Sequence, residues 1–198
     1  MEILETVTFD DAFAKRLQRS IAFTESIMTK MVTGELTSPE ITEAMLLWSR
    51  FANASLVKTK NGARGFFVTY LTSDSTLADN PSPEVITALE SSPDIVAELL
   101  VKNLAMSAAM GLNHRRNGKE DMAQGSDRVR CSVGAAPRTR SANLIKQLNM
   151  PSLFDIAQQL RQSALTGVGN YQEFLQRWRY DSEQKQVIHQ ALSEILDE

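Results

Sequence analysis

Apolar residues recur at helical spacing along most of the chain, and two stretches show this pattern in different forms. Residues 9–33 carry an apolar stripe on one side, which predicts an amphipathic helix that ends near Gly34. That stripe comprises Phe13, Leu17, Ile21, Met28 and Met31. Residues 93–114 are apolar on most sides at 100° per residue, which is typical of a helix surrounded by other helices. The sequence therefore predicts a bundle built around a central helix at 93–114.

Three copies of one start signal divide the N-terminal two thirds of the chain. They are Ser38-Pro39-Glu40, Ser82-Pro83-Glu84 and Ser92-Pro93-Asp94. In each, serine can cap the first amides, proline suits the first helical turn, and the acid interacts favourably with the helix dipole. We expect helices over about 38–56, 83–91 and 93–114.

Residues 61–80 contain the one ambiguous element. Phe66, Phe67, Val68, Tyr70 and Leu71 are bulky and bracketed by turn residues, so a buried strand and a buried helix both fit residues 64–72. A single strand would have no second strand to pair with. We therefore favour a short helix whose aromatic side chains fill the core.

The C-terminal third predicts several shorter helices. Residues 137–149 place Leu144, Ile145 and Leu148 inward, and three further apolar stripes follow before the end of the chain. Asp181 with Gln184 matches a capping box. We predict an all-α fold: a multi-helix bundle around 93–114 with a short C-terminal helical subdomain. A weak boundary near residue 135 would separate a bundle core at 1–135 from a helical segment at 136–198.

Composition sets the class of protein. The chain has 198 residues, 42% hydrophobic and 23% charged, which is ordinary for a globular protein with a sizeable core. The single Cys131 cannot form an internal disulfide, and the first residues carry acids in place of a secretory n-region. No run approaches the ~18 apolar residues of a membrane span. We expect a cytoplasmic protein that does not enter a membrane.

Charge is unevenly distributed along the chain. Between Lys102 and Lys146 nine basic residues stand against three acidic ones, a net charge of +6. The whole chain carries −3, so the remaining residues carry −9. Such asymmetry indicates a partner for one of the two regions, or contact between them.

The basic segment 115–140 is the candidate binding site. In extended backbone, Arg128 and Arg130 would face one way, as would Arg138 and Arg140, and guanidinium groups suit phosphate or carboxylate. The predicted anion-binding residues are Arg115, Arg116, Lys119, Arg128, Arg130, Arg138 and Arg140. The competing interpretation is that these cations pair with the chain's own acids. A nucleic-acid interface is disfavoured by the pI of about 5.5 and by the lack of interleaved aromatics.

Catalytic and metal motifs are absent from the sequence. There are two histidines, His114 and His189, far apart along the chain, and Cys131 beside Arg130 is the one thiol. We predict no catalytic residue, no metal and no cofactor. The first hypothesis is a non-catalytic interaction or assembly protein that binds a protein partner or itself. The alternative is a binder of phosphate, nucleotide or nucleic acid through 115–140. The third is an enzyme using Cys131 or His114.

Overall fold

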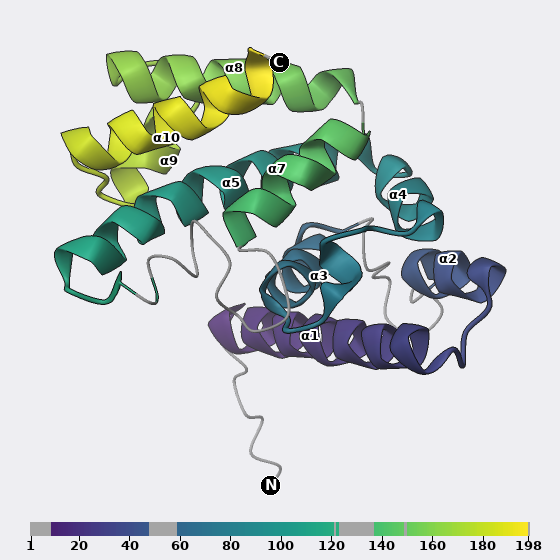
Figure 1. Cartoon of the computed structure of the whole chain (residues 1–198). Helices are drawn as coiled ribbons and strands as arrows, with labels where there is room; N and C mark the ends of the chain where they lie inside the picture. The colour runs from purple at the N-terminus through teal and green to yellow at the C-terminus, as the bar shows by residue number, and fades with distance from the viewer. Residues whose placement is uncertain (1–8, 48–58, 121, 123–136, 149, 198) are drawn as a thin grey trace, which may run out of the picture.

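The all-α prediction is confirmed. A computed structural model describes residues 9–47, 59–120, 122, 137–148 and 150–197, and these residues form helices and connecting turns with no strand among them (Figure 1). The α-helices are α1 (Phe9–Thr33), α2 (Ser38–Leu47), α3 (Lys60–Thr72), α4 (Pro83–Glu90), α5 (Pro93–Arg116), α7 (Pro137–Leu148), α8 (Pro151–Thr166), α9 (Gln172–Arg177) and α10 (Ser182–Leu196). A single 3₁₀ turn, η2 (Thr76–Ala78), follows α3.

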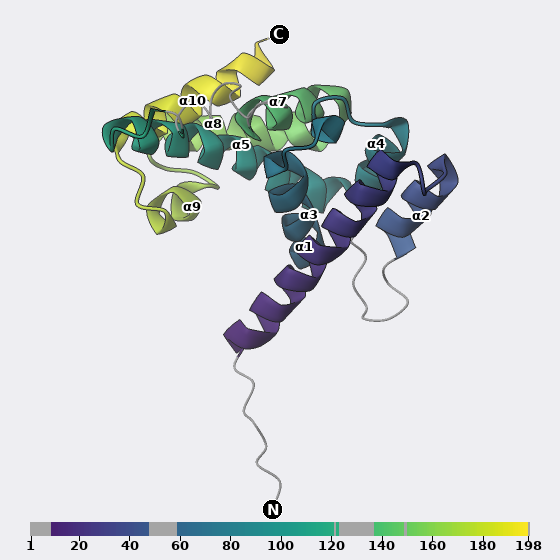
Figure 2. The ribbon, with the colours of Figure 1, turned by 60° about the horizontal axis from the view of Figure 1, so that its bottom comes forward.

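Helix α5 lies between two groups of helices. In Figures 1 and 2, α8 and α10 lie on one side of it, and α1, α2 and α3 lie on the other. It packs against α3, α4, α7, α8 and α10. Val96, Leu100 and Leu104 of α5 are at most 1% exposed, which accounts for the apolar character of this helix on most sides.

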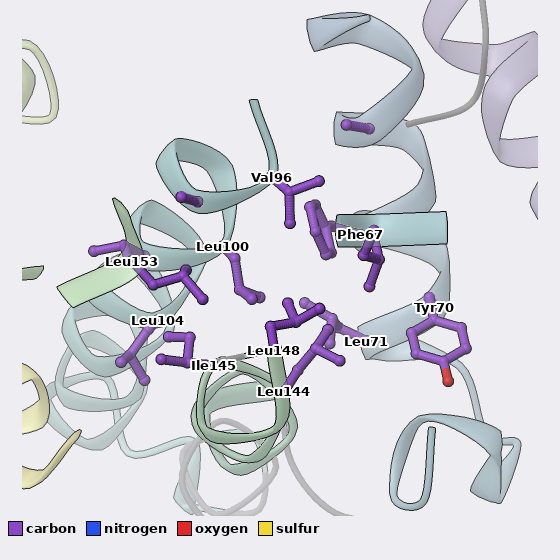
Figure 3. Close-up of a cluster of buried hydrophobic side chains, with 14 of the residues drawn as sticks. Phe67, Tyr70, Leu71, Val96, Leu100, Leu104, Leu144, Ile145, Leu148 and Leu153 are labelled. Carbon is purple, nitrogen blue, oxygen red and sulfur yellow. The ribbon is translucent and has the colours of Figure 1, made fainter. Parts of the chain in front are cut away.

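The buried core runs across the predicted boundary at residue 135. Figure 3 shows Phe67 of α3, Leu100 of α5, Ile145 of α7 and Leu153 of α8 in one cluster of buried side chains. Residues 123–136, which contain the boundary, lie outside the described residues. The division into 1–135 and 136–198 therefore stays a prediction, although helices from both parts share this core.

The proline start signals place two helix boundaries correctly but cap them differently from the prediction. Helices α4 and α5 begin at Pro83 and Pro93, as expected, with proline in the first turn. The side chains of Ser82 and Ser92 make no capping hydrogen bond, so that part of the prediction is wrong. Their backbone carbonyls instead accept the first helical hydrogen bonds, from the amides of Ile86 (3.1 Å) and Val96 (3.0 Å).

Helix α3 resolves the ambiguity of residues 64–72 in favour of a helix. The Thr59 side chain accepts a hydrogen bond from the amide of Gly62 and caps its start. Small residues then let α3 approach α1 closely: the Ser20 hydroxyl donates to the Gly62 carbonyl (2.7 Å). A Cβ at Gly65 would lie 2.4 Å from the Ser20 Oγ. The α1–α3 contact thus depends on a glycine where they cross.

Helix α5 is long and apolar enough to cross a membrane, by length and composition alone. This is weak evidence for a membrane span, because a buried core helix can have the same length and composition. Of its apolar window, 56% is buried within the structure.

Candidate functional site

Arg140 is a buried structural residue. Its side chain is 2% exposed, and all five N–H donors of its guanidinium are used within the chain. Nε and Nη2 donate to the Asp79 carboxylate at 2.7 and 3.3 Å. The remaining donors contact the carbonyls of Leu71 (3.1 Å), Ser73 (2.7 Å) and Ser75 (2.9 Å). Arg140 therefore ties α7 to the segment that joins α3 to η2, and no donor remains for a ligand.

Tyr70 completes this polar cluster. Its hydroxyl donates to the carbonyl of Leu77 at 2.7 Å, and its ring stacks on Phe66 with centroids 4.9 Å apart. Burial raises the pKa of Tyr70, and the nearby Arg140 guanidinium partly opposes that shift. The 71–79 segment is thus held from two sides, by the arginine and by the tyrosine.

Arg138 does not share a surface with Arg140. Both belong to helix α7, where residues two apart point about 200° from each other, so the extended pairing expected for them is wrong. Arg138 donates to the Glu194 carboxylate of α10 at 2.8 Å. The missed signal is that Arg140 lies four residues before Leu144, on the apolar side of the predicted helix.

Arg116 is also paired within the chain. At the end of α5 it contacts two carboxylates at the start of α10, those of Asp181 and Glu183. Asp181 is the N-cap of α10 and forms the predicted capping box with Gln184. The Arg116 hydrogen bond lowers the pKa of Asp181 to about 2, with a further contribution from the backbone amide of Gln184. The pair therefore links the C-terminal end of α5 to the N-terminal end of α10.

The predicted anion-binding residues thus do not form one surface in the described part of the chain. Arg116, Arg138 and Arg140 each contact a different acid, on α10 or beside η2. Arg115 and Lys119 are exposed near the C-terminal end of α5. Arg128 and Arg130 lie outside the described residues. The interpretation that basic residues pair with the chain's own acids thus accounts for three of the seven.

The candidate catalytic residues are not brought together. His114 lies in α5 and His189 in α10, and Cys131 falls outside the described residues. Glu98 and Lys102, four residues apart on α5, form an ion pair at 2.6 Å, and Lys60 adds a contact to Glu98 at 3.4 Å. Among the described residues, no group of three or more His, Cys, Asp or Glu could hold a metal ion.

An open groove lies between α1 and α3 in the described part of the chain. Its volume is about 480 Å³, within the usual range for binding sites. One wall comes from α1 and the other from α3 and the residues after it. The lining residues are Ile21, Glu25, Met28, Thr29, Val32, Thr33, Val68, Thr69, Thr72, Ser73 and Ser75.

The groove presents apolar side chains to solvent. Val32 is 66% exposed and Val68 is 45% exposed, whereas the lining residue Met28 is buried and Ile21 is half-buried. On α1 the lining positions 21, 25, 28 and 32 are separated by four, three and four residues, the spacing of a coiled-coil seam. The predicted apolar stripe of residues 9–33 included Ile21 and Met28 but did not indicate that these residues also line a groove.

Hydroxyl groups border the apolar floor. Thr29 and Thr72 donate to backbone carbonyls of their own helices, those of Glu25 and Val68. Thr69, 9% exposed, has a buried hydroxyl oxygen with no hydrogen-bond partner in the structure. The wall formed by α3 and the residues after it ends in Ser73 and Ser75, whose carbonyls accept hydrogen bonds from Arg140. Arg140 therefore holds one side of the groove in place from behind.

The fold and this site define an all-helical protein with a solvent-exposed apolar groove between two helices. A family model described as uncharacterised conserved protein UCP020893 matches residues 16–195. The chain belongs to this family. No curated protein and no solved structure matches the chain.

Proposed function

We propose that this protein is a non-catalytic interaction protein that binds a helix of a protein partner in the α1–α3 groove. The observation that carries the proposal is a pair of exposed apolar side chains that line the groove from its two helices, Val32 of α1 (66% exposed) and Val68 of α3 (45% exposed). The groove-lining residues of α1 extend from Ile21 to Thr33, over about 18 Å at 1.5 Å per residue. That length matches three turns of a docked helix.

A helix is the occupant that the spacing favours. Positions 21, 25, 28 and 32 form a seam into which apolar residues of a third helix can pack at i, i+3 or i+4, and i+7. Helix α1 also lies at the edge of the molecule in both views (Figures 1 and 2), so a third helix can approach it. Cys131 is the single cysteine of the chain, which favours the cytoplasm as the compartment in which the protein binds this partner.

A second copy of the chain is a poorer occupant. In a symmetric contact the same groove would meet itself, so each Glu25 would approach the stripe of the other copy, which carries no cation. The apolar seam would then bury two carboxylates without partners, which is costly. We therefore propose that the occupant of the groove is a helix of a different protein.

The test uses a designed amphipathic peptide of about 18 residues with a leucine seam at this spacing, labelled with a fluorophore. Val32→Asp places a charge in the groove and should weaken binding at least about tenfold, the equivalent of 1.4 kcal/mol. The matched control is Leu165→Asp. Leu165 is 65% exposed and, like Val32, is followed by the last threonine of its helix and a left-handed glycine.

Binding that the groove variant weakens and the control leaves unchanged supports the proposal. Absence of binding, or equal loss in both variants, overturns it. Light scattering completes the experiment: a mass of twice 22.0 kDa that Val32→Asp returns to the monomer value would assign the groove to a second copy instead.

The alternative function is binding of phosphate, nucleotide or nucleic acid through residues 115–140. Three of its seven predicted cations, Arg116, Arg138 and Arg140, have acids of this chain as partners, and Arg115 also has an interaction within the chain. This alternative therefore depends mainly on Lys119, Arg128 and Arg130. Titration with RNA, DNA and inorganic phosphate at low salt tests it. Affinity that falls steeply with salt and with Lys119→Gln would support it, and no binding would remove it.

A further inference from the structure

We infer that the helix bound in the α1–α3 groove carries a lysine or arginine at the position that faces Glu25. This inference rests on the proposed function and adds the chemistry of the partner. Glu25 occupies one of the four seam positions on α1, between Ile21 and Met28. It is the one charged residue among the groove's lining residues.

Glu25 differs from other carboxylates that lie against packed surfaces of this protein. Asp79, Glu98 and Glu194 each contact a cation from another part of the chain. The side chain of Glu25 has no ion pair or hydrogen bond within the described residues, and only its backbone carbonyl is used, by Thr29. No lysine or arginine lines the groove to provide one.

A docked apolar helix would remove water from this carboxylate. Burial of an ionised group without a partner is unfavourable, whereas a cation opposite it offsets most of that penalty. Glu25 therefore selects against helices with leucine or an acid at the facing position. It works as a specificity element in a groove that would otherwise accept any apolar helix.

The preference rests on the local contact at Glu25 and not on the charge of the surrounding helices. Helix α1 carries four basic and three acidic residues, and α3 carries two basic and no acidic residues, so the two groove-forming helices have a net charge of +3. A cation on the partner is therefore favoured only opposite the Glu25 carboxylate. The partner class is thus an amphipathic helix with a basic residue inside its apolar seam.

Three labelled peptides of equal net charge separate this inference from the proposed function. They share one apolar seam and differ at its central position, which is leucine, lysine or glutamate, with compensating changes on the solvent side. We expect wild-type protein to bind the lysine peptide at least about tenfold more tightly than the glutamate peptide at low salt, a difference of about 1.4 kcal/mol. Equal net charge holds non-specific attraction constant.

Two variants assign that preference to Glu25. Glu25→Gln should reduce the lysine preference to below about threefold, and Glu25→Lys should reverse it, because the charge at one seam position changes sign. The Glu25 side chain is exposed, so both variants should retain the wild-type circular dichroism spectrum and melting temperature. A lysine preference that both variants leave intact overturns the inference.

The remaining outcomes are also decisive. If all three peptides bind equally and Val32→Asp weakens each of them, the inference fails while the proposed function stands. If none binds, the proposed function fails as well. If the leucine peptide binds best, the groove accepts helices by apolar contact alone and Glu25 stays hydrated in the complex.

Discussion

Replacing Arg140 with methionine should destabilise the protein more than any other single change to its basic segment. Methionine keeps most of the length and apolar volume of the side chain but removes five donors. The Asp79 carboxylate, with a side chain 19% exposed, would lose its cation. The carbonyls of Leu71, Ser73 and Ser75 would lose their donor at the same time.

The expected loss is about 3–5 kcal/mol, the cost of breaking a buried ion pair by removing one partner. That is a large part of the roughly 5–15 kcal/mol that stabilises a typical domain. Arg138→Met, two residues away on the same helix, is the matched control. Its partner Glu194 has a side chain 54% exposed, so this change should cost about 0.2–1 kcal/mol.

Urea unfolding measures both values, followed by circular dichroism and by tryptophan fluorescence so that agreement of the two curves tests two-state behaviour. Asp79→Asn completes a double-mutant cycle, and it should cost much less when Arg140 is already methionine. If Arg140→Met falls within about 1 kcal/mol of Arg138→Met, the buried network does not hold the 71–79 segment, and the reasoning is refuted.

Three further predictions follow from the helix contacts. Gly65→Ala should lower stability by about 1–3 kcal/mol in urea unfolding, because its Cβ would lie 2.4 Å from the Ser20 Oγ, and should cost less in a Ser20→Gly background. Because the folded pKa of Asp181, about 2, lies below its ordinary 3.8, its contribution to stability is present above pH 4 and lost as pH falls through 2. Asp181→Asn should remove that part of the acid dependence, and an unchanged stability profile between pH 2 and 4 would contradict the assignment. Tyr70→Phe should remove part of the stability loss above pH 10, since burial disfavours the tyrosinate in the folded state.

Local signals predicted the helices well because each depends on neighbours in sequence. Prolines set the starts of α4 and α5, and Gly34, with φ of 70°, ends α1 where the sequence indicated. Ser82 and Ser92 show the limit of such signals. Either serine can cap, but whether its hydroxyl turns toward the helix depends on side chains packed around it.

The basic segment shows why the candidate site was harder to predict. Counting charges identified an uneven distribution correctly, but a charge count does not say which acid each arginine contacts. The partners of Arg116, Arg138 and Arg140 lie 65, 56 and 61 residues away along the chain, at distances set only by helix packing. One local signal did indicate burial of Arg140: it lies four residues before Leu144, on the apolar side of the predicted helix. The assumption of extended backbone for the basic segment led us to overlook this signal.

The groove is the feature that tertiary structure alone decided. Hydrophobic periodicity assigned Ile21 and Met28 to a stripe on α1, and that assignment holds whether the stripe is covered or open. Which helix packs on α1, and how much of the stripe it covers, depends on the close contact of Ser20 with Gly62 and Gly65 of α3. The sequence by itself determined an all-helical chain and most helix ends, because capping and periodicity are local. Helix packing decided which arginines are buried and which apolar residues, Val32 and Val68 among them, stay exposed to solvent.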